Sequence, residues 1–313
     1  MKQRTWGFVG VVLSSACLAM AGSFDASLVS RDANWVMHID FSALRASTIG
    51  ESLLARDVPA DVQQQWQRAE QMLGMDLRKD LHAVTMYGSA VGQDDVVVWI
   101  QGKLDPGTLA SQLENMDGYQ RLDHGSHVVH SWVDAPGEMD ASRVYGVAVD
   151  GGRGVLGPSE ALILKALQVM DGTLPNVTDG GISVATLTGS GLLMAATADL
   201  RHADLSANPM LAQAGSNARN FRMDIREADG MLGVRMAVQQ GSVQDAQQAM
   251  EMLNGFKMMG LMQLQQQNPD LAALLQAIAI NRNEDTLLLG LSYPSRKLVA
   301  MMQEAAVPFV TGP

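Results

Sequence analysis

The stretch Phe221–Val238, FRMDIREADGMLGVRMAV, decides the fold class because it predicts two short strands joined by a tight turn. Asp229-Gly230 lies between the expected strands Phe221–Ile225 and Met231–Val238, and Asp-Gly is among the strongest short-range signals of a β-hairpin. A helix is expected directly afterwards, over Val243–Leu253. The stretch therefore indicates antiparallel strands with helices between them.

The same order is expected earlier in the chain. Leu81–Tyr87 and Val96–Gln101 predict two strands joined by the polar turn Gly92-Gln93-Asp94, and the helix Pro106–Leu113 follows with proline in its first turn. Further elements are expected at Trp35–Phe41, Tyr119–Leu122, His127–Val133, Val144–Val149 and Gly154–Leu156 (strands), and at Ala60–Leu73, Glu160–Met170, Phe256–Gln267, Asp270–Ala279 and Arg296–Glu304 (helices). Hairpins with interspersed helices favour an antiparallel α+β fold over a doubly wound sheet.

The chain repeats part of its own sequence. Three segments recur in the same order, Trp35–Ala55 as Gly191–Leu211, Val96–Asn115 as Arg235–Asn254, and Gly154–Ile163 as Gly290–Val299. Their common order predicts two tandem, divergent α+β repeats, at residues 22–175 and 191–313, with 176–190 as the linker. Chance similarity among amphipathic segments is the alternative explanation.

Residues 1–21 predict a cleavable secretory signal peptide. Lys2 and Arg4 precede an uncharged, largely apolar run, and Ala19-Met20-Ala21 places small residues where a leader peptidase cleaves, after Ala21. The apolar run is shorter than a spanning helix needs. We therefore expect a secreted or periplasmic protein without stable membrane insertion after cleavage. An uncleaved anchor, or a lipoprotein modified at Cys17, is the alternative.

Composition excludes several classes of function. Cleavage would remove Cys17, the only cysteine, and with it any disulfide, thiolate metal site or cysteine nucleophile. The net charge of −11 makes nucleic-acid binding and attraction to anionic membranes unfavourable. With 47% hydrophobic and 18% charged residues, the composition is that of a globular protein.

Gly152-Arg153-Gly154-Val155-Leu156-Gly157 has the form GxGxxG, the spacing of a dinucleotide-binding turn. Val155 and Leu156 are apolar, however, and the next helix is expected only after Pro158-Ser159. The segment aligned with it by the repeat keeps only Gly290. We therefore interpret the motif as a hairpin turn and returning strand, and expect no bound cofactor.

His124, His127 and His130 form HxxHxxH, and imidazoles are good zinc ligands. Their apolar neighbours predict a strand, in which His127 and His130 would point to opposite faces, with His124 in the turn. The three histidines are therefore kept as metal candidates only. Acidic residues in the expected turns are candidates for a calcium or carboxylate site, namely Asp94, Asp95, Glu227, Asp229, Glu284 and Asp285.

Methionines crowd the expected helices after Val243. Met250, Met252, Met258, Met259 and Met262 have spacings used by soft Cu(I) sites. Leucines and a phenylalanine are interleaved with them, which indicates an apolar helix face packed in the core or against a partner. Met258, Met259 and Met262 are the partner-binding candidates.

Three segments resemble uncharacterised secreted bacterial proteins with tandem α+β repeats, namely Trp35–Leu44, the hairpin ending His130-Ser131-Trp132, and Tyr145–Gly172. The resemblance implies a fold but no activity and no catalytic residues. The leading hypothesis is a non-catalytic exported protein that binds or scaffolds a protein or other component of the envelope or extracellular space. The alternatives are an extracytoplasmic hydrolase with a metal or carboxylate centre and periplasmic copper handling.

Overall fold

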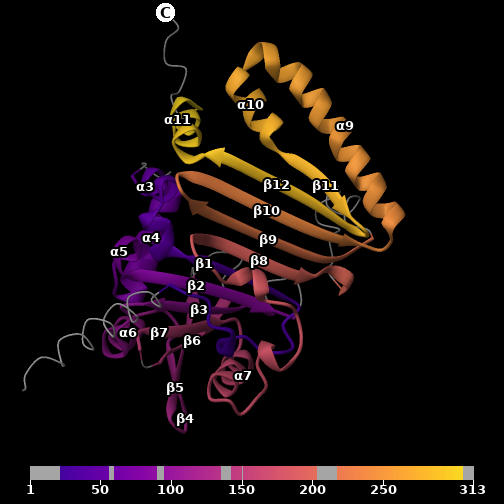
Figure 1. The fold of residues 1–313 in the computed structure, drawn as a ribbon. Helices are drawn as coiled ribbons and strands as arrows, with labels where there is room; N and C mark the ends of the chain where they lie inside the picture. Colours follow the sequence, from indigo (N-terminus) through magenta and orange to yellow (C-terminus); the bar gives the residue numbers. More distant parts are fainter. Residues whose placement is uncertain are drawn as a thin grey trace, which may run out of the picture.

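The structure is a computed structural model that describes residues 22–55, 60–89, 95–134, 142–149, 151–202 and 217–305. In these residues twelve strands form one antiparallel sheet in the order β11-β12-β10-β9-β8-β1-β2-β3-β7-β6-β5-β4 (Figure 1). Helices lie against it between the hairpins. The expected α+β class is therefore confirmed.

The strands of the described chain are β1 (Trp35–Asp40), β2 (Leu81–Gly88), β3 (Val97–Gly102), β4 (Gln120–His124), β5 (His127–Asp134), β6 (Ser142–Val149), β7 (Arg153–Gly157), β8 (Leu192–Asp199), β9 (Ala218–Ala228), β10 (Met231–Gln240), β11 (Ala279–Asn283) and β12 (Thr286–Pro294). The α-helices are α2 (Phe41–Ala46), α3 (Thr48–Leu54), α4 (Ala60–Leu73), α5 (Leu77–Asp80), α6 (Pro106–Leu113), α7 (Glu160–Met170), α9 (Val243–Gln267), α10 (Pro269–Ala277) and α11 (Ser295–Ala305). Short 3-10 helices are η1 (Ala26–Leu28), η3 (Val177–Asp179), η4 (Ala185–Leu187) and η5 (Leu200–His202).

Local signals explain the best-predicted elements. Asp229 and Gly230 both have positive φ, 52° and 73°, as a type I′ turn between β9 and β10 requires. The Ser159 side chain accepts a hydrogen bond from the Leu162 N–H and so caps α7. Asp105 caps α6 in the same way. The hairpin and both helices are confirmed.

One helix differs from the expectation. The segments Val243–Leu253 and Phe256–Gln267, expected as separate helices, form the single helix α9. Asn254-Gly255 between them does not end the helix. The Asn254 side chain donates a hydrogen bond to the Met250 carbonyl one turn earlier, at 3.0 Å, and a helical backbone continues through both residues.

The two halves of the chain meet at the centre of the sheet. Strand β1 pairs antiparallel with β8, with Trp35 opposite Ala198 and His38 opposite Ala195. Outward from this seam, the first half contributes β2, β3, β7 and β6, and the second contributes β9, β10, β12 and β11. The hairpin β4–β5 extends the first half further, whereas the second half carries the long helix α9 and α10 instead.

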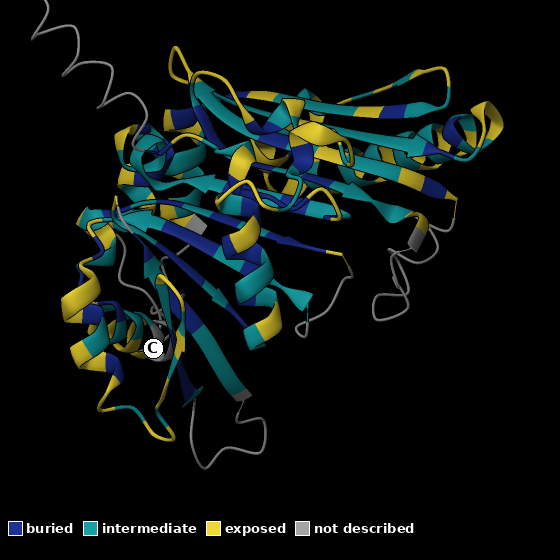
Figure 2. Ribbon diagram, turned by 90° about the horizontal axis from the view of Figure 1, so that it is seen from below, coloured by how far each residue is buried: buried dark blue, intermediate teal, exposed yellow. Residues whose placement is uncertain are grey.

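Buried apolar residues cover both faces of the first half of the sheet. Trp99 and Ile100 are successive in β3 and therefore point to opposite faces. Trp99 belongs to a cluster that includes Ile163 of α7, and Ile100 belongs to a second cluster with Leu109 of α6. Neither cluster contains a residue beyond Ala195. Figure 2 shows buried residues along the strands and exposed residues on the outer sides of the helices.

The segment expected as a linker, 176–190, packs on the first-half core. Val177 and Leu187 are buried in the same cluster as Trp99, and the Val177 N–H donates to the Val29 carbonyl at 2.8 Å.

Within the described ranges, no helix has the length and apolar character needed to cross a bilayer.

Candidate functional site

Two histidines of the β4–β5 hairpin, His124 and His127, contact separate carboxylates. His124 ends β4 and lies opposite His127, the first residue of β5. Nε2 of His124 lies 2.7 Å from Oε1 of Glu160, and Nε2 of His127 lies 3.3 Å from Oδ2 of Asp171. Glu160 begins α7 and Asp171 caps its end. The two pairs therefore hold the hairpin against both ends of one helix.

His130 points to the opposite face of β5 from His127, as the strand prediction requires. Its Nδ1 lies 2.9 Å from the Tyr119 hydroxyl, and the two rings stack. Burial lowers the pKa of His130.

Nowhere in the described residues do three or more His, Cys, Asp or Glu side chains gather as metal ligands would. His124, His127 and His130 each contact a different residue, namely Glu160, Asp171 and Tyr119.

The glycine motif forms a turn and a strand. Gly151 and Gly152 have φ of 80° and 72° and turn the chain into β7. A Cβ atom on Gly152 would lie 2.1 Å from the carbonyl oxygen of Gly102, while the Gly102 N–H donates to the Gly152 carbonyl at 2.9 Å. The glycine is needed for this close approach to the end of β3. The hairpin interpretation is confirmed.

Three of the turn carboxylates, those of Asp95, Glu227 and Asp285, have local structural partners, and Asp94 lies outside the described residues. Glu227 accepts hydrogen bonds from the Thr48 and Ile49 N–H groups at the start of α3, at 2.9 and 3.1 Å. Asp285 accepts hydrogen bonds from Gln239 and Thr286. These acids stabilise helix and hairpin ends.

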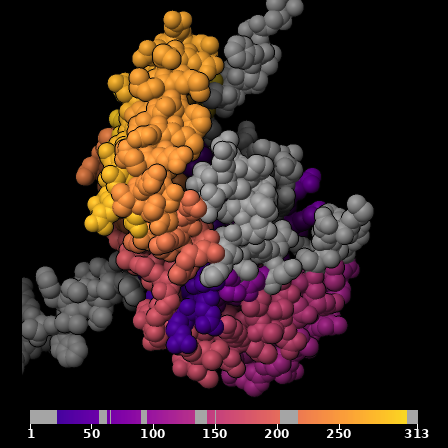
Figure 3. Space-filling model, turned by 90° about the vertical axis from the view of Figure 1, so that its right-hand side faces the viewer, coloured from indigo at the N-terminus to yellow at the C-terminus, as the bar shows by residue number. Residues whose placement is uncertain are grey.

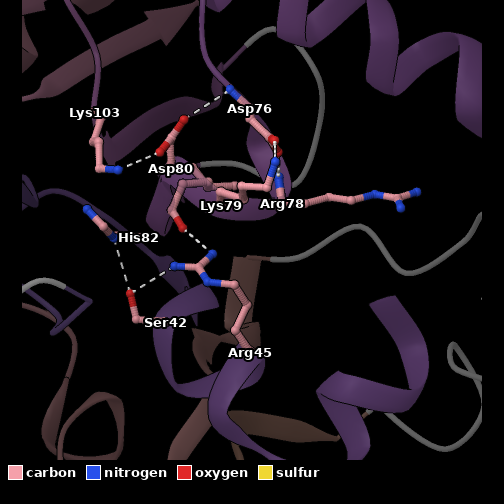
Figure 4. A network of polar contacts seen from close by, with 9 residues as sticks. Ser42, Arg45, Asp76, Arg78, Lys79, Asp80, His82 and Lys103 are labelled. Carbon is pink, nitrogen blue, oxygen red and sulfur yellow. Dashed lines mark hydrogen bonds and ion pairs between the residues drawn. The ribbon is translucent and has the colours of Figure 1, made fainter. Parts of the chain in front are cut away.

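A polar network near the start of β2 brings a serine hydroxyl next to a histidine ring (Figure 4). The Ser42 hydroxyl lies 3.3 Å from Nδ1 of His82, and Arg45 donates to the same hydroxyl at 3.3 Å. Burial, followed by the charges of Arg45 and Lys103, lowers the pKa of His82, so the ring is neutral at pH 7. Within the described network no carboxylate hydrogen-bonds the other ring nitrogen, so the orienting partner of a catalytic triad is missing.

The methionine candidates lie on the outer side of α9, which runs along the surface facing the viewer in Figure 3. Met258, Met259 and Met262 are 60%, 59% and 69% exposed. The core version of the packing prediction is therefore wrong for these three. The helix carries apolar residues all round, and only its opposite side packs. Lys257 on that side donates to the carbonyl of Gln276, near the end of α10, at 3.0 Å.

Met252 and Phe256 extend the same exposed surface, at 40% and 57% exposure. We refer to Met252, Phe256, Met258, Met259 and Met262 together as the α9 face. Met252, Phe256 and Met259 follow the i, i+4, i+7 spacing of one helix side, and the face spans about 15 Å at the ~1.5 Å rise per residue of an α-helix. Sequence spacing identified the residues but could not identify their exposure.

Comparisons with known proteins find similarity in solved structures alone. No protein-family description and no curated protein matches the chain. Crystal form III of TP0453 is 9% identical, with a TM-score of 0.48, over 90% of this chain and 99% of that one. Crystal form I of TP0453 is 9% identical, with a TM-score of 0.45, over 90% and 98%.

Proposed function

We propose that the protein is a non-catalytic, exported binding protein whose α9 face docks on an apolar surface of a partner protein. The observation that carries the proposal is the exposure of Met258, Met259 and Met262 next to exposed Phe256. Contiguous exposed apolar side chains mark interaction surfaces in soluble proteins. Methionine is suited to such a surface because its flexible thioether adapts to irregular partners.

The charges of α9 favour a protein partner over an anionic lipid surface. The helix carries Asp245 and Glu251 but a single cation, Lys257, which donates to the carbonyls of Gln276 and Ile278 at the end of α10. Interfacial membrane helices usually carry several Lys or Arg on the polar side of their apolar face. The net charge of −11 adds repulsion from anionic lipids.

The test replaces Met258, Met259 and Met262 together by glutamine, which keeps side-chain length and removes apolar character. We expect capture of an envelope protein by the purified chain to be lost, with the unfolding midpoint unchanged because all three side chains are exposed. Met231→Gln, an exposed methionine at the start of β10, is the matched control. Equal capture by the triple variant and the wild type would refute the docking proposal.

The same exposure favours a second candidate function, binding of Cu(I). Met258 and Met262 are one helical turn apart and Met259 is adjacent, so three accessible thioethers share one part of the helix. Thioethers are soft ligands that select Cu(I). Leucine in place of all three keeps the apolar surface and removes the sulfur. Cu(I) titration against a chromophoric competitor under reducing conditions separates the candidates: copper handling requires binding by the wild type and none by the leucine variant.

The proposal also includes export by a cleaved signal peptide and an origin of the fold in two tandem repeats. Cleavage after Ala21 would release a chain that begins at Gly22, and residues 1–21 lie outside the described residues. Mass spectrometry of the protein from its native envelope tests this start. The shared order of strand, hairpin, helix, hairpin and helix supports tandem repeats at 22–175 and 191–313, joined by 176–190.

A further inference from the structure

A hollow of about 400 Å³ lies where the two halves of the chain meet, beside the β1–β8 seam. Side chains and backbone from three parts of the sequence line it. They are Arg31, Ala33 and Asn34 before β1, Gly181, Ile182 and Ser183 of the connecting segment, and Thr197, Asp199, Arg201, Asn220 and Arg222 of the second half. We call this hollow the junction pocket.

The charge of the junction pocket is opposite to that of the whole protein. Three guanidinium groups and one carboxylate line it, in a chain with a net charge of −11. Asp199 pairs with Arg201. Arg31 and Arg222 form no ion pair with any carboxylate in the described ranges. The pocket therefore carries an excess of positive charge.

A carboxylate beside Arg31 is already engaged by a lysine. Asp32, next to Arg31 in the chain, accepts a hydrogen bond from Lys165 of α7 at 2.9 Å. That contact and the lysine's charge hold the pKa of Asp32 below its usual range, so it stays ionised and bound to Lys165. Arg31 itself lies along Gly180 and Gly181, where a Cβ atom at Gly181 would come within 2.5 Å of the Arg31 carbonyl oxygen.

The polar floor of the pocket is ordered by contacts of its own. Thr197 is buried and lies opposite Arg222 in the pairing of β8 with β9. Asn34 donates from its side chain to the Ser89 carbonyl at 2.8 Å, and Asn220 donates to Gln239 at 2.7 Å. Strand pairing and these hydrogen bonds therefore fix the backbone beneath the segments that carry Arg31 and Arg222.

We propose that the junction pocket binds a small anionic metabolite through its phosphate or carboxylate oxygens, held by Arg31 and Arg222. A guanidinium group presents planar N–H donors that match a pair of such oxygens. The volume lies within the range of small-molecule sites, which favours a free ligand over a macromolecular surface. The site is separate from the α9 face, so either assignment can fail without the other.

The test measures binding of inorganic phosphate and of citrate to the purified protein by isothermal titration calorimetry at low ionic strength. We expect Arg222→Gln and Arg31→Gln each to weaken binding at least tenfold. Arg219→Gln is the matched control, because Arg219 is an exposed arginine of β9 outside the lining and the variant changes net charge equally. Preference for phosphate or citrate identifies the oxyanion class.

Three results would overturn the proposal. The first is no binding of either anion by the wild type at millimolar concentration. The second is equal weakening by Arg219→Gln and Arg222→Gln, which would mean diffuse attraction without a site. The third is binding to phosphatidylglycerol vesicles, lost in Arg222→Gln, without binding of free phosphate or citrate, which would assign the arginines to a lipid headgroup.

Discussion

Replacing Gly152 by alanine should destabilise the protein more than replacing its neighbour Gly151. Both glycines have φ in the left-handed region, 72° and 80°, so each alanine carries a strain of about 1–2 kcal/mol. They differ in what a Cβ atom would meet. At Gly151 the nearest atom is Nε of Arg153 at 3.9 Å, whereas at Gly152 it is the Gly102 carbonyl oxygen at 2.1 Å.

The clash at Gly152 cannot be relieved by a side-chain movement, because the opposing atom belongs to the backbone. The turn must move away from β3, which breaks the hydrogen bond from the Gly102 N–H to the Gly152 carbonyl. Losing that hydrogen bond lowers the free energy of unfolding by about 1 kcal/mol more. The movement of the turn also strains the adjacent pairing of Gln101 with Arg153. We therefore expect the free energy of unfolding to fall by about 1–2 kcal/mol for Gly151→Ala and by about 2–4 kcal/mol for Gly152→Ala.

Urea unfolding followed by circular dichroism measures both variants, with the free energy compared at a common slope. Gly172→Ala is a further control, because Gly172 has φ of 73° and no atom within 4 Å of a built Cβ. Equal destabilisation by Gly151→Ala and Gly152→Ala would contradict the steric argument, and with it the reason given for a glycine at the third position of the hairpin turn.

Three further perturbations follow from buried or capping groups. Trp99→Ala should cost about 3–5 kcal/mol in urea unfolding, because the ring is completely buried and donates to the Leu28 carbonyl. Burial lowers the pKa of His38, so the folded state keeps the ring neutral while the unfolded chain takes up a proton; stability should fall as pH drops through about 6.5, and less steeply in His38→Gln. Asp105→Ala should cost about 1 kcal/mol through loss of the α6 cap, whereas Asp105→Ser should restore most of it.

Local chemistry determined the elements that could be predicted. Asp229-Gly230 specifies a turn whichever residues lie far away, and Ser159 caps a helix through its own next turn. The pairing of β1 with β8 has no such local signal, because its strands lie more than 150 residues apart and either could pair elsewhere. Periodicity identifies a strand but does not name its neighbour.

The sequence pattern could not predict which side of α9 packs against the rest of the protein. Leu253 and Leu264 point to the packed side and Met259 to solvent, but all three are apolar, so spacing alone offers two possible buried sides. A helix that is apolar all round is usually buried all round. Here only one side meets the sheet and α10, and that depends on the path of the chain after Gln267.

The junction pocket was hidden for a different reason. Arg31 and Arg201 are isolated cations in the sequence, and Arg222 lies in a strand between Arg219 and Arg226; neither pattern indicates more than a solvated surface. They meet because β1 and β8 are paired at the centre of the sheet, which brings the residues before β1 next to those after β8. A site of this kind can be inferred only once the long-range pairing is known.

The division of the core explains why binding surfaces can lie in the second half. The cluster around Trp99 ends at Ala195 and the cluster around Ile100 ends at Trp132, so most of the clustered apolar packing lies in the first half and β8. The outer side of α9 and Arg222 contribute little buried apolar area, and substitutions there have a small effect on the free energy of unfolding. The fold therefore constrains the side chains at these positions less than it constrains Trp99 or Ile163, which are buried in the core.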